Sequence, residues 1–403
     1  MRVLKTLITL TKERSIKTND WIFLLLASII PISDRAFLLF SQQLWSKMVA
    51  DVIICFLFFC LIFFKKYSFF INIRLLIPIF LSTFLPFLFI FTEITEASLR
   101  QAVSLCLSIV YVFLIVACIE RCGLIRFGKF VIWLSGLNCF FIVLTGFFPE
   151  VFSFLLSNFS QEGREVLGYK LPFIRNAGFY NHYAYFGVSL LGALLVFEYM
   201  RKVSEVGKVH YFLYWILSYS AVIVSQSRVV LIGLLFVHLL LFSYKVKISF
   251  VYKLTSILAL LIIFNIEIFE MWNMLIEIKK GTFDQRLDQI NIGFNIFAEN
   301  PIFGSGYSSF SEENPDQVLH NIFFNILSSI GLVGLSFFIL MNLSLLYIQK
   351  YRYERHIVAI FLFGMYIILS GSSGLSFYSL WQVVAIAIAI AIHSKRANNL
   401  KES

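Results

Sequence analysis

Two arginines and one histidine are the side chains of this sequence best suited to chemistry. Arg228 follows the segment VIVSQS, Arg286 opens the pattern RLDQINIGFNIFAENP, and His320 stands at the start of an apolar stretch. An arginine guanidinium offers a planar, bidentate donor pair that suits a diphosphate. A histidine can accept a proton near neutral pH. If the three side chains converge, they could hold an anionic leaving group and activate a hydroxyl as a nucleophile.

Each of these residues also has a simpler structural interpretation. Arg228 could extend to lipid phosphates at a membrane surface, and Arg286 could pair with Asp284 or Asp288 on a solvated helix face. A lone histidine at the end of an apolar segment is more often structural. Conversely, an arginine in the first turn of a helix opposes the helix dipole unless it meets an anionic ligand. Sequence spacing alone leaves both alternatives open.

The elements that must position these side chains are overwhelmingly apolar. Hydrophobic residues make up 59% and charged residues 14% of the 403 residues, and the mean hydropathy is +0.85. Soluble domains are typically about 45–50% apolar and about 25% charged. We therefore predict an all-α polytopic membrane protein that forms a single integral membrane domain over residues 1–403. A chain of this length has room for about twelve helices of about 20 residues each.

Apolar runs along the chain predict where those spans lie. They cover residues 21–40, 47–64, 73–92, 101–118, 130–147, 179–199, 211–227, 229–243, 249–268, 319–347, 356–371 and 377–393. Arg228 then falls in a tight hairpin between two spans.

The positions of lysine and arginine predict the orientation of the spans. About 23 of the 33 basic residues lie in seven segments, namely 1–20, 65–74, 119–129, 200–210, 244–253, 348–355 and 394–403. By the positive-inside rule these segments are cytoplasmic, so both termini are expected inside the cell. The net charge of +10 is therefore mostly a signal of topology. It does not indicate nucleic-acid binding, because no basic cluster is interleaved with stacking aromatic residues.

Two longer polar loops, residues 148–178 and 269–318, then lie on the outer side. The second contains apolar residues at helical spacing, which predicts an amphipathic helix that ends at Asn300-Pro301. This helix would lie on the outer membrane surface or roof a cavity, with Arg286 near its start. In the following PIFGSGYSSF stretch, Gly304 and Gly306 indicate a turn. The apolar residues at this spacing are Phe283, Leu287, Ile290, Phe294 and Phe297.

Further polar residues on the outer side could contact a glycan, because amide and aromatic groups suit sugar hydroxyls and faces. Some of them could equally satisfy buried polar groups at the top of a span. No phosphate-binding loop, HExxH motif or Cys/His cluster is present, so neither nucleotide-driven chemistry nor metal dependence is supported. The candidate contact residues are Arg175, Asn181, His182, Tyr307 and Asn321.

The motifs SRVVLIGLL, QRLDQINIGFNIFAENPIFGSGYSSF and HNIFFNILSSIGLVGL occur in that order over about residues 225–335. This order resembles the C-terminal signature of the O-antigen polymerase and O-antigen ligase superfamily of bacterial membrane glycosyltransferases. The resemblance implies a GT-C-like fold and an inverting, metal-independent transfer from undecaprenyl diphosphate at the periplasmic face, with no cofactor. It also makes Arg228 and Arg286 diphosphate-binding residues, and His320 the base or positioning group for the acceptor hydroxyl.

Two activities fit this resemblance, and a third, of another class, would also need arginines on the outer side. The first is polymerisation of undecaprenyl-diphosphate-linked repeat units into O-antigen or a related surface polysaccharide, as part of lipopolysaccharide biosynthesis. The second is ligation of the glycan to lipid A core, and a rival of another class is a flippase or transporter of the lipid-linked oligosaccharide. We expect a multi-pass protein of the bacterial inner membrane that contacts membrane lipid, with a chain-length regulator or other assembly proteins as possible partners.

Overall fold

The computed structural model describes the chain mainly at residues 123–148, 183–203, 207–246, 287–306, 321–370 and 378–402. Shorter described pieces lie between residues 106 and 119 and between 165 and 180, and Phe56 is described alone. The predicted spans 21–40, 73–92 and 249–268, and all of 47–64 except Phe56, lie outside the described residues. Only part of the predicted span 101–118 is described.

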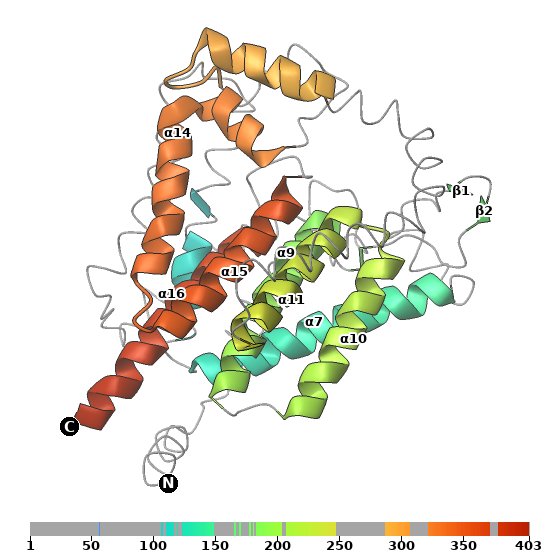
Figure 1. Ribbon diagram of the computed structural model, residues 1–403, viewed down its shortest axis with the longest axis vertical. Coiled ribbons are helices and arrows are strands. Elements are labelled where there is room, and N and C mark those ends of the chain that lie inside the picture. The colour runs from blue at the N-terminus through green and yellow to red at the C-terminus, as the bar shows by residue number, and fades with distance from the viewer. Residues whose placement is uncertain are drawn as a thin grey trace.

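The described elements are almost all helical (Figure 1). The exception is a hairpin of two short antiparallel strands, in which Glu165 pairs with Lys170 and Val166 with Tyr169. One further helix, residues 287–299, carries no label and is called the surface helix below. The labelled elements are α7 (Leu124–Phe147), β1 (Glu165–Val166), β2 (Tyr169–Lys170), α9 (Tyr183–Lys202), α10 (Lys208–Val224), α11 (Arg228–Val246), α14 (Ile322–Tyr347), α15 (Arg352–Leu369) and α16 (Tyr378–Glu402).

These labelled helices correspond to seven of the predicted spans, and the prediction of a mainly helical fold is confirmed for the described residues. By length and apolarity, α7, α9 and α14 could each cross a membrane, and shorter apolar stretches lie in α10, α11 and α16. The count of about twelve spans stays a prediction. Some helices extend beyond the apolar runs that predicted them. Helix α16, for example, continues to Glu402, whereas the predicted span ends at residue 393. Hydropathy marks the membrane core and does not fix the end of a helix.

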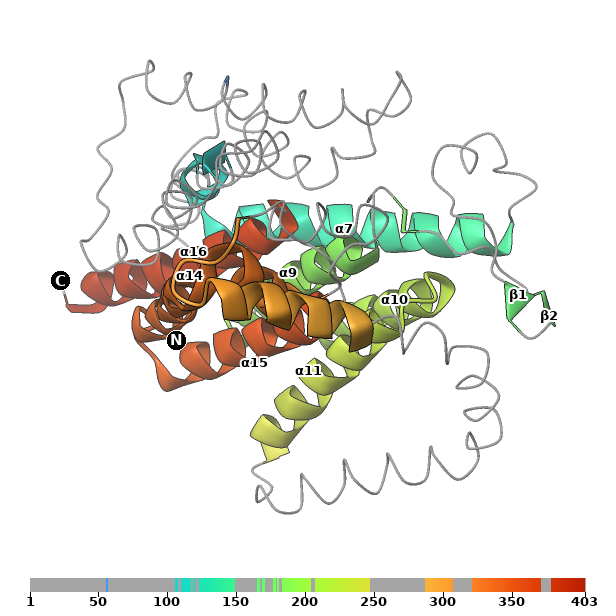
Figure 2. The same cartoon turned by 90° about the horizontal axis from the view of Figure 1, so that it is seen from above.

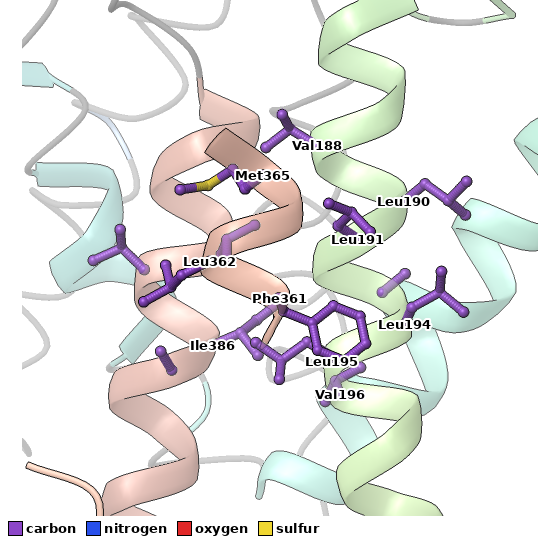
Figure 3. Close-up of a cluster of buried hydrophobic side chains, with 14 of the residues drawn as sticks. Val188, Leu190, Leu191, Leu194, Leu195, Val196, Phe361, Leu362, Met365 and Ile386 are labelled. Atoms are coloured by element: carbon purple, nitrogen blue, oxygen red, sulfur yellow. The ribbon is translucent and has the colours of Figure 1, made fainter. Parts of the chain in front are cut away.

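Helix α9 is the centre of the packing. It is buried almost throughout from Phe186 to Met200, and it contacts α7, α10, α11, α15 and α16. Figure 3 shows side chains of α9, among them Leu191 and Leu195, facing Phe361 of α15 and Ile386 of α16. Gly233 of α11 and Gly364 of α15 allow those two helices to approach closely, because a Cβ atom on Gly233 would lie 3.1 Å from the carbonyl oxygen of Gly364. A helix enclosed on all sides in this way holds its neighbours in a fixed arrangement.

One end of the bundle is held together by a buried carboxylate. Glu198 of α9 is fully buried and accepts hydrogen bonds from Arg201 at 2.8 Å, from Tyr211 of α10 at 2.7 Å and from Tyr353 of α15 at 3.2 Å. Nearby, Ser394 of α16 donates to a carboxylate oxygen of Glu354. The three segments 200–210, 348–355 and 394–403 therefore meet at one end, as their predicted common side of the membrane requires.

Candidate active site

The opposite end of the bundle brings together the helices that begin next to Arg228 and His320. Val230 in the first turn of α11 and Ile368 in the last turn of α15 both lie against Gly187 of α9. In the first turn of α14, Phe323 packs its ring 5.9 Å from that of Tyr366, also near the end of α15. The starts of α11 and α14 therefore share the same end of α15.

The turn before α11 is as tight as the apolar runs predict. Helix α10 ends at Val224, and α11 begins at Arg228. Ser225 is fully buried and donates its hydroxyl to the carbonyl of Val222 at 2.8 Å, while Gln226 adopts a positive φ of 52°. The carbonyl of Ser227 accepts the first helical bond of α11, from Leu231 at 3.0 Å. This fixed turn sets the backbone position of Arg228, whose side chain lies outside the described residues.

The predicted amphipathic helix is present over residues 287–299, followed by Asn300-Pro301 as expected. The face that packs against the protein consists of Gln289, Gly293 and Ile296, and Ile296 contacts Phe324 of α14. Seen from above, the helix extends over the end of the bundle (Figure 2).

The apolar stripe predicted from spacing only partly faces the protein. Leu287 and Phe294 on that stripe are 43% and 53% exposed, and in the following turn Ile302 and Phe303 are 58% and 43% exposed. These four exposed apolar side chains of the surface helix and its turn are called the outer apolar face below. A helix with one face on the protein and a second apolar face uncovered is typical of a position at a membrane surface.

Gln289 is a candidate that the sequence analysis missed. Its side chain is only 4% exposed, and its amide oxygen has no hydrogen-bond partner among the described residues. It follows Arg286 by three residues, a spacing that puts two helical residues on one face. The pattern RLDQ already places Gln289 three residues after Arg286. The sequence analysis instead took the apolar residues at helical spacing, such as Leu287 and Phe294, as the face that packs on the protein.

The turn that follows the surface helix has the glycine geometry that the sequence predicts. Gly304 and Gly306 have φ values of 75° and 97°. The turn contacts α14 where that helix is interrupted at Gly331, which has φ 65° and ψ −164°. Figure 1 shows the two halves of α14 running in different directions. The sequence predicted one continuous span over residues 319–347, so this interruption is a difference between prediction and structure.

Asn321 begins the first half of α14 directly after His320. Its side-chain oxygen accepts hydrogen bonds from the amides of Phe323 at 3.0 Å and Phe324 at 3.3 Å, so Asn321 is the N-cap of the helix. Such caps satisfy amides that have no partner inside the helix. The predicted role of Asn321 as a glycan contact stays a prediction, and the structure adds a structural role to it.

Several other predicted site residues lie outside the described part of the chain. These are Arg286, His320, Arg175, Asn181, His182 and Tyr307. Just before Asn181 in the chain, Tyr180 donates its hydroxyl to Ser189 at 2.5 Å. Ser189 in turn donates to the side-chain oxygen of Gln382 at 3.1 Å. This chain of bonds anchors the segment before Asn181 to α9 and α16. Within the described residues, no group of three or more His, Cys, Asp or Glu side chains could hold a metal ion.

Residues 212–339 match a protein-family model described as O-antigen ligase. A search of curated proteins found no match to the chain. The matched range begins in α10 and ends in the second half of α14, so it contains Arg228, Arg286 and His320 together with the surface helix. The match confirms the predicted resemblance to the O-antigen polymerase and O-antigen ligase superfamily.

Proposed function

We propose that this chain, which carries the O-antigen ligase family region at residues 212–339, is a membrane glycosyltransferase that uses a glycan linked to undecaprenyl diphosphate as donor. One structural observation supports the proposal most. The helix starts next to Arg228 and His320 lie at the same end of α15, and the surface helix that follows Arg286 packs on α14 through Ile296 and Phe324. Three separate parts of the family region thus meet at one place.

The reaction follows from the chemistry of these side chains. The acceptor hydroxyl oxygen attacks the anomeric carbon of the donor glycan, and the bond between that carbon and the diphosphate oxygen breaks. His320 takes the hydroxyl proton, a contribution of about 10²–10⁴-fold in rate. Undecaprenyl diphosphate leaves with the electron pair of the broken bond, and Arg228 and Arg286 stabilise the charge that develops on it. Attack opposite to the leaving group inverts the anomeric configuration.

The proposed location of this site is the periplasmic end of a GT-C-like bundle with about twelve spans and cytoplasmic termini. Two features support it. Three of the seven segments predicted to be cytoplasmic meet at the Glu198 end, away from the starts of α11 and α14. The outer apolar face of the surface helix suits the boundary between membrane and periplasm, where a lipid-linked diphosphate group resides.

Gln289 is part of the proposed site as well. Helical spacing predicts that Arg286 and Gln289 lie on the face of the surface helix that packs toward α14. An uncompensated buried amide oxygen is costly, on the order of 1–3 kcal/mol, unless a partner is supplied. A sugar hydroxyl of the bound substrate would be such a partner. Gln289 is therefore proposed as a glycan contact, beside the residues Arg175, Asn181, His182, Tyr307 and Asn321 proposed from the sequence.

We place polymerisation of lipid-linked repeat units first among the possible activities, and ligation to lipid A core second. Ligation is kept as the alternative because the matching family model is described as O-antigen ligase. Both use the same donor and differ only in the acceptor. A flippase for the same lipid would bind the diphosphate but would need no base, so it accounts less well for His320. For a polymerase, a chain-length regulator in the same membrane is the expected partner.

Purified protein in lipid nanodiscs, supplied with an undecaprenyl-diphosphate-linked repeat unit, tests the proposal. A polymerase forms a ladder of longer glycans without any other acceptor. A ligase forms product only when lipid A core is added. Transport of the lipid across a vesicle bilayer, with no new glycosidic bond under either condition, would reject both enzymes in favour of the flippase.

A further inference from the structure

At the interruption of α14, backbone groups of this helix form hydrogen bonds with the turn that follows the surface helix. In a continuous α-helix, the amides of Leu332 and Val333 would donate to carbonyls four residues earlier. Here Leu332 donates to the carbonyl of Pro301 at 2.9 Å, and Val333 donates to the carbonyl of Ile302 at 3.1 Å. The turn after the surface helix therefore supplies the acceptors that the broken helix lacks.

The same exchange runs in the other direction. The carbonyls of Ser328 and Ser329 are among those that the break leaves without helical partners. Ser328 accepts from the amide of Ser305 at 2.8 Å, and Ser329 accepts from the amide of Gly306 at 3.2 Å. Four hydrogen bonds thus join residues 301–306 to residues 328–333, and we call these four bonds the backbone junction. Four of the backbone groups freed by the break are satisfied in this way, and unsatisfied backbone groups are costly beside a membrane.

Two glycines make this close backbone contact possible. Gly331 adopts a combination of φ and ψ that is essentially restricted to glycine. A Cβ atom there would lie 2.5 Å from the carbonyl carbon of Ile302, and a Cβ atom on Gly304 would lie 2.5 Å from the backbone nitrogen of Ile330. Any side chain at these positions would force the turn and α14 apart.

The turn is tied equally firmly to the surface helix. The hydroxyl of Ser305 donates to the carbonyl of Ile296 at 3.2 Å and accepts from the side-chain amide of Asn300 at 3.0 Å. The amide of Gly304 donates to the carbonyl of Asn300 at 2.8 Å. Because the amide of Ser305 also belongs to the backbone junction, this one residue links the surface helix to α14.

We propose that the surface helix and the turn, residues 287–306, and the first half of α14, residues 321–330, form one rigid unit that is closed by the backbone junction. The unit begins directly after Arg286 and includes Asn321 directly after His320, so the junction fixes the separation of the proposed diphosphate-binding and base residues. Gly304 and Gly331 are accordingly positioning residues. This inference rests on the proposed function for its catalytic consequence, but the rigidity of the unit can be tested without it.

A cross-link across the junction tests the rigidity. Ile302 and Leu332 lie beside each other at the junction, and their side chains are 58% and 50% exposed. In a background without the native cysteines, the double variant Ile302→Cys/Leu332→Cys is treated with a short thiol-specific reagent whose link is cleaved by reductant. We expect a high yield of intramolecular cross-link and glycan transfer that stays within about twofold of the untreated variant. The two single-cysteine variants control for alkylation of either position alone.

Two results of this experiment would overturn the inference. Failure to cross-link would show that the turn and α14 are not adjacent. Cross-linking that stops transfer, with recovery after reduction, would show that the turn must release from α14 during turnover. If the wild-type protein transfers no glycan at all, the proposed function fails instead, while the cross-linking yield still decides whether the junction exists.

The variant Gly331→Ala tests the positioning role. A displacement of about 1 Å at a reacting group can cost about 10²-fold in rate, so we expect kcat to fall by about 10- to 100-fold while KM for the donor changes by less than about threefold. Gly136→Ala is the matched control, because its Cβ atom would lie 3.5 Å from the nearest atom, an ordinary contact. Unchanged kcat in Gly331→Ala, or a loss that appears only as lower protein yield, would argue against positioning.

Discussion

Substitutions of Asn321 separate its observed role as a helix cap from its predicted role as a glycan contact. The side-chain oxygen of Asn321 accepts two amide hydrogen bonds, at 3.0 and 3.3 Å. Replacing such a cap by alanine typically costs about 1 kcal/mol, whereas serine caps about as well as asparagine. Serine keeps the acceptor oxygen but removes the amide donors. The pair Asn321→Ala and Asn321→Ser therefore changes the two roles separately.

A loss of about 1 kcal/mol corresponds to about a fivefold increase in local opening of the first turn of α14. Hydrogen exchange at the amides of Phe323 and Phe324 should speed up by about that factor in Asn321→Ala and remain near wild type in Asn321→Ser. Because His320 is the preceding residue, we expect transfer to fall about tenfold in the alanine variant. The serine variant should keep most of its activity.

The assay combines hydrogen exchange with glycan transfer on the same preparations. The cap explanation is refuted if Asn321→Ser exchanges as slowly as wild type but transfers as poorly as Asn321→Ala. In that case the amide donors, which serine lacks, would act on the substrate directly. Equal exchange rates in all three proteins would show that the cap contributes nothing measurable to the first turn.

Three further predictions concern stability and membrane contact. Burial raises the pKa of Glu354 above its ordinary value of 4.5, so the stability that this group contributes is greatest below that value and is lost as pH rises through the raised pKa. Thermal unfolding should therefore find Glu354→Gln at least as stable as wild type at pH 7.5, with the difference shrinking toward pH 5; a large loss at pH 7.5 would contradict this. Gly364→Ala adds a Cβ atom that overlaps Val237, so a denaturation assay should show about 1–3 kcal/mol of destabilisation, and no change would mean that the two helices can separate at little cost. A polarity-sensitive dye on Phe294→Cys should report an apolar environment in nanodiscs and the same dye on Glu299→Cys a polar one, whereas two polar signals would place the surface helix away from the membrane.

The turns and the helix end at the site were predictable from sequence, because each depends on residues that are neighbours in the chain. The tight turn between α10 and α11 follows from the adjacent apolar runs 211–227 and 229–243, although the structure places it at Ser225–Ser227, so that Arg228 begins α11. The positive φ values of Gly304 and Gly306 follow from glycine itself, because only glycine adopts them without strain. The end of the surface helix follows from Asn300-Pro301, since proline cannot continue a helix.

Features that depend on distant partners were not predictable in this way. Gly331 lies in the run SSIGLVGL, which has the composition of an uninterrupted span, and the break is stable only because the turn at Pro301–Gly306 supplies its hydrogen bonds. Glu198 lies inside a predicted span, and its partner Tyr353 is 155 residues away in the sequence. Such contacts are set by the packing of whole helices. The roles of Arg286 and His320, which lie outside the described residues, stay predictions.

The measurement that tests the central claim most directly is glycan transfer by His320→Ala in purified form. Wild-type protein and His320→Ala are compared in nanodiscs with an undecaprenyl-diphosphate-linked repeat unit, with and without lipid A core, and Arg286→Lys is added as a variant that keeps the charge but loses the bidentate geometry. We predict that His320→Ala reaches the membrane in normal amount and forms no product with either acceptor, and that Arg286→Lys is impaired. Full transfer by His320→Ala would contradict the assignment of the base and with it the proposed mechanism.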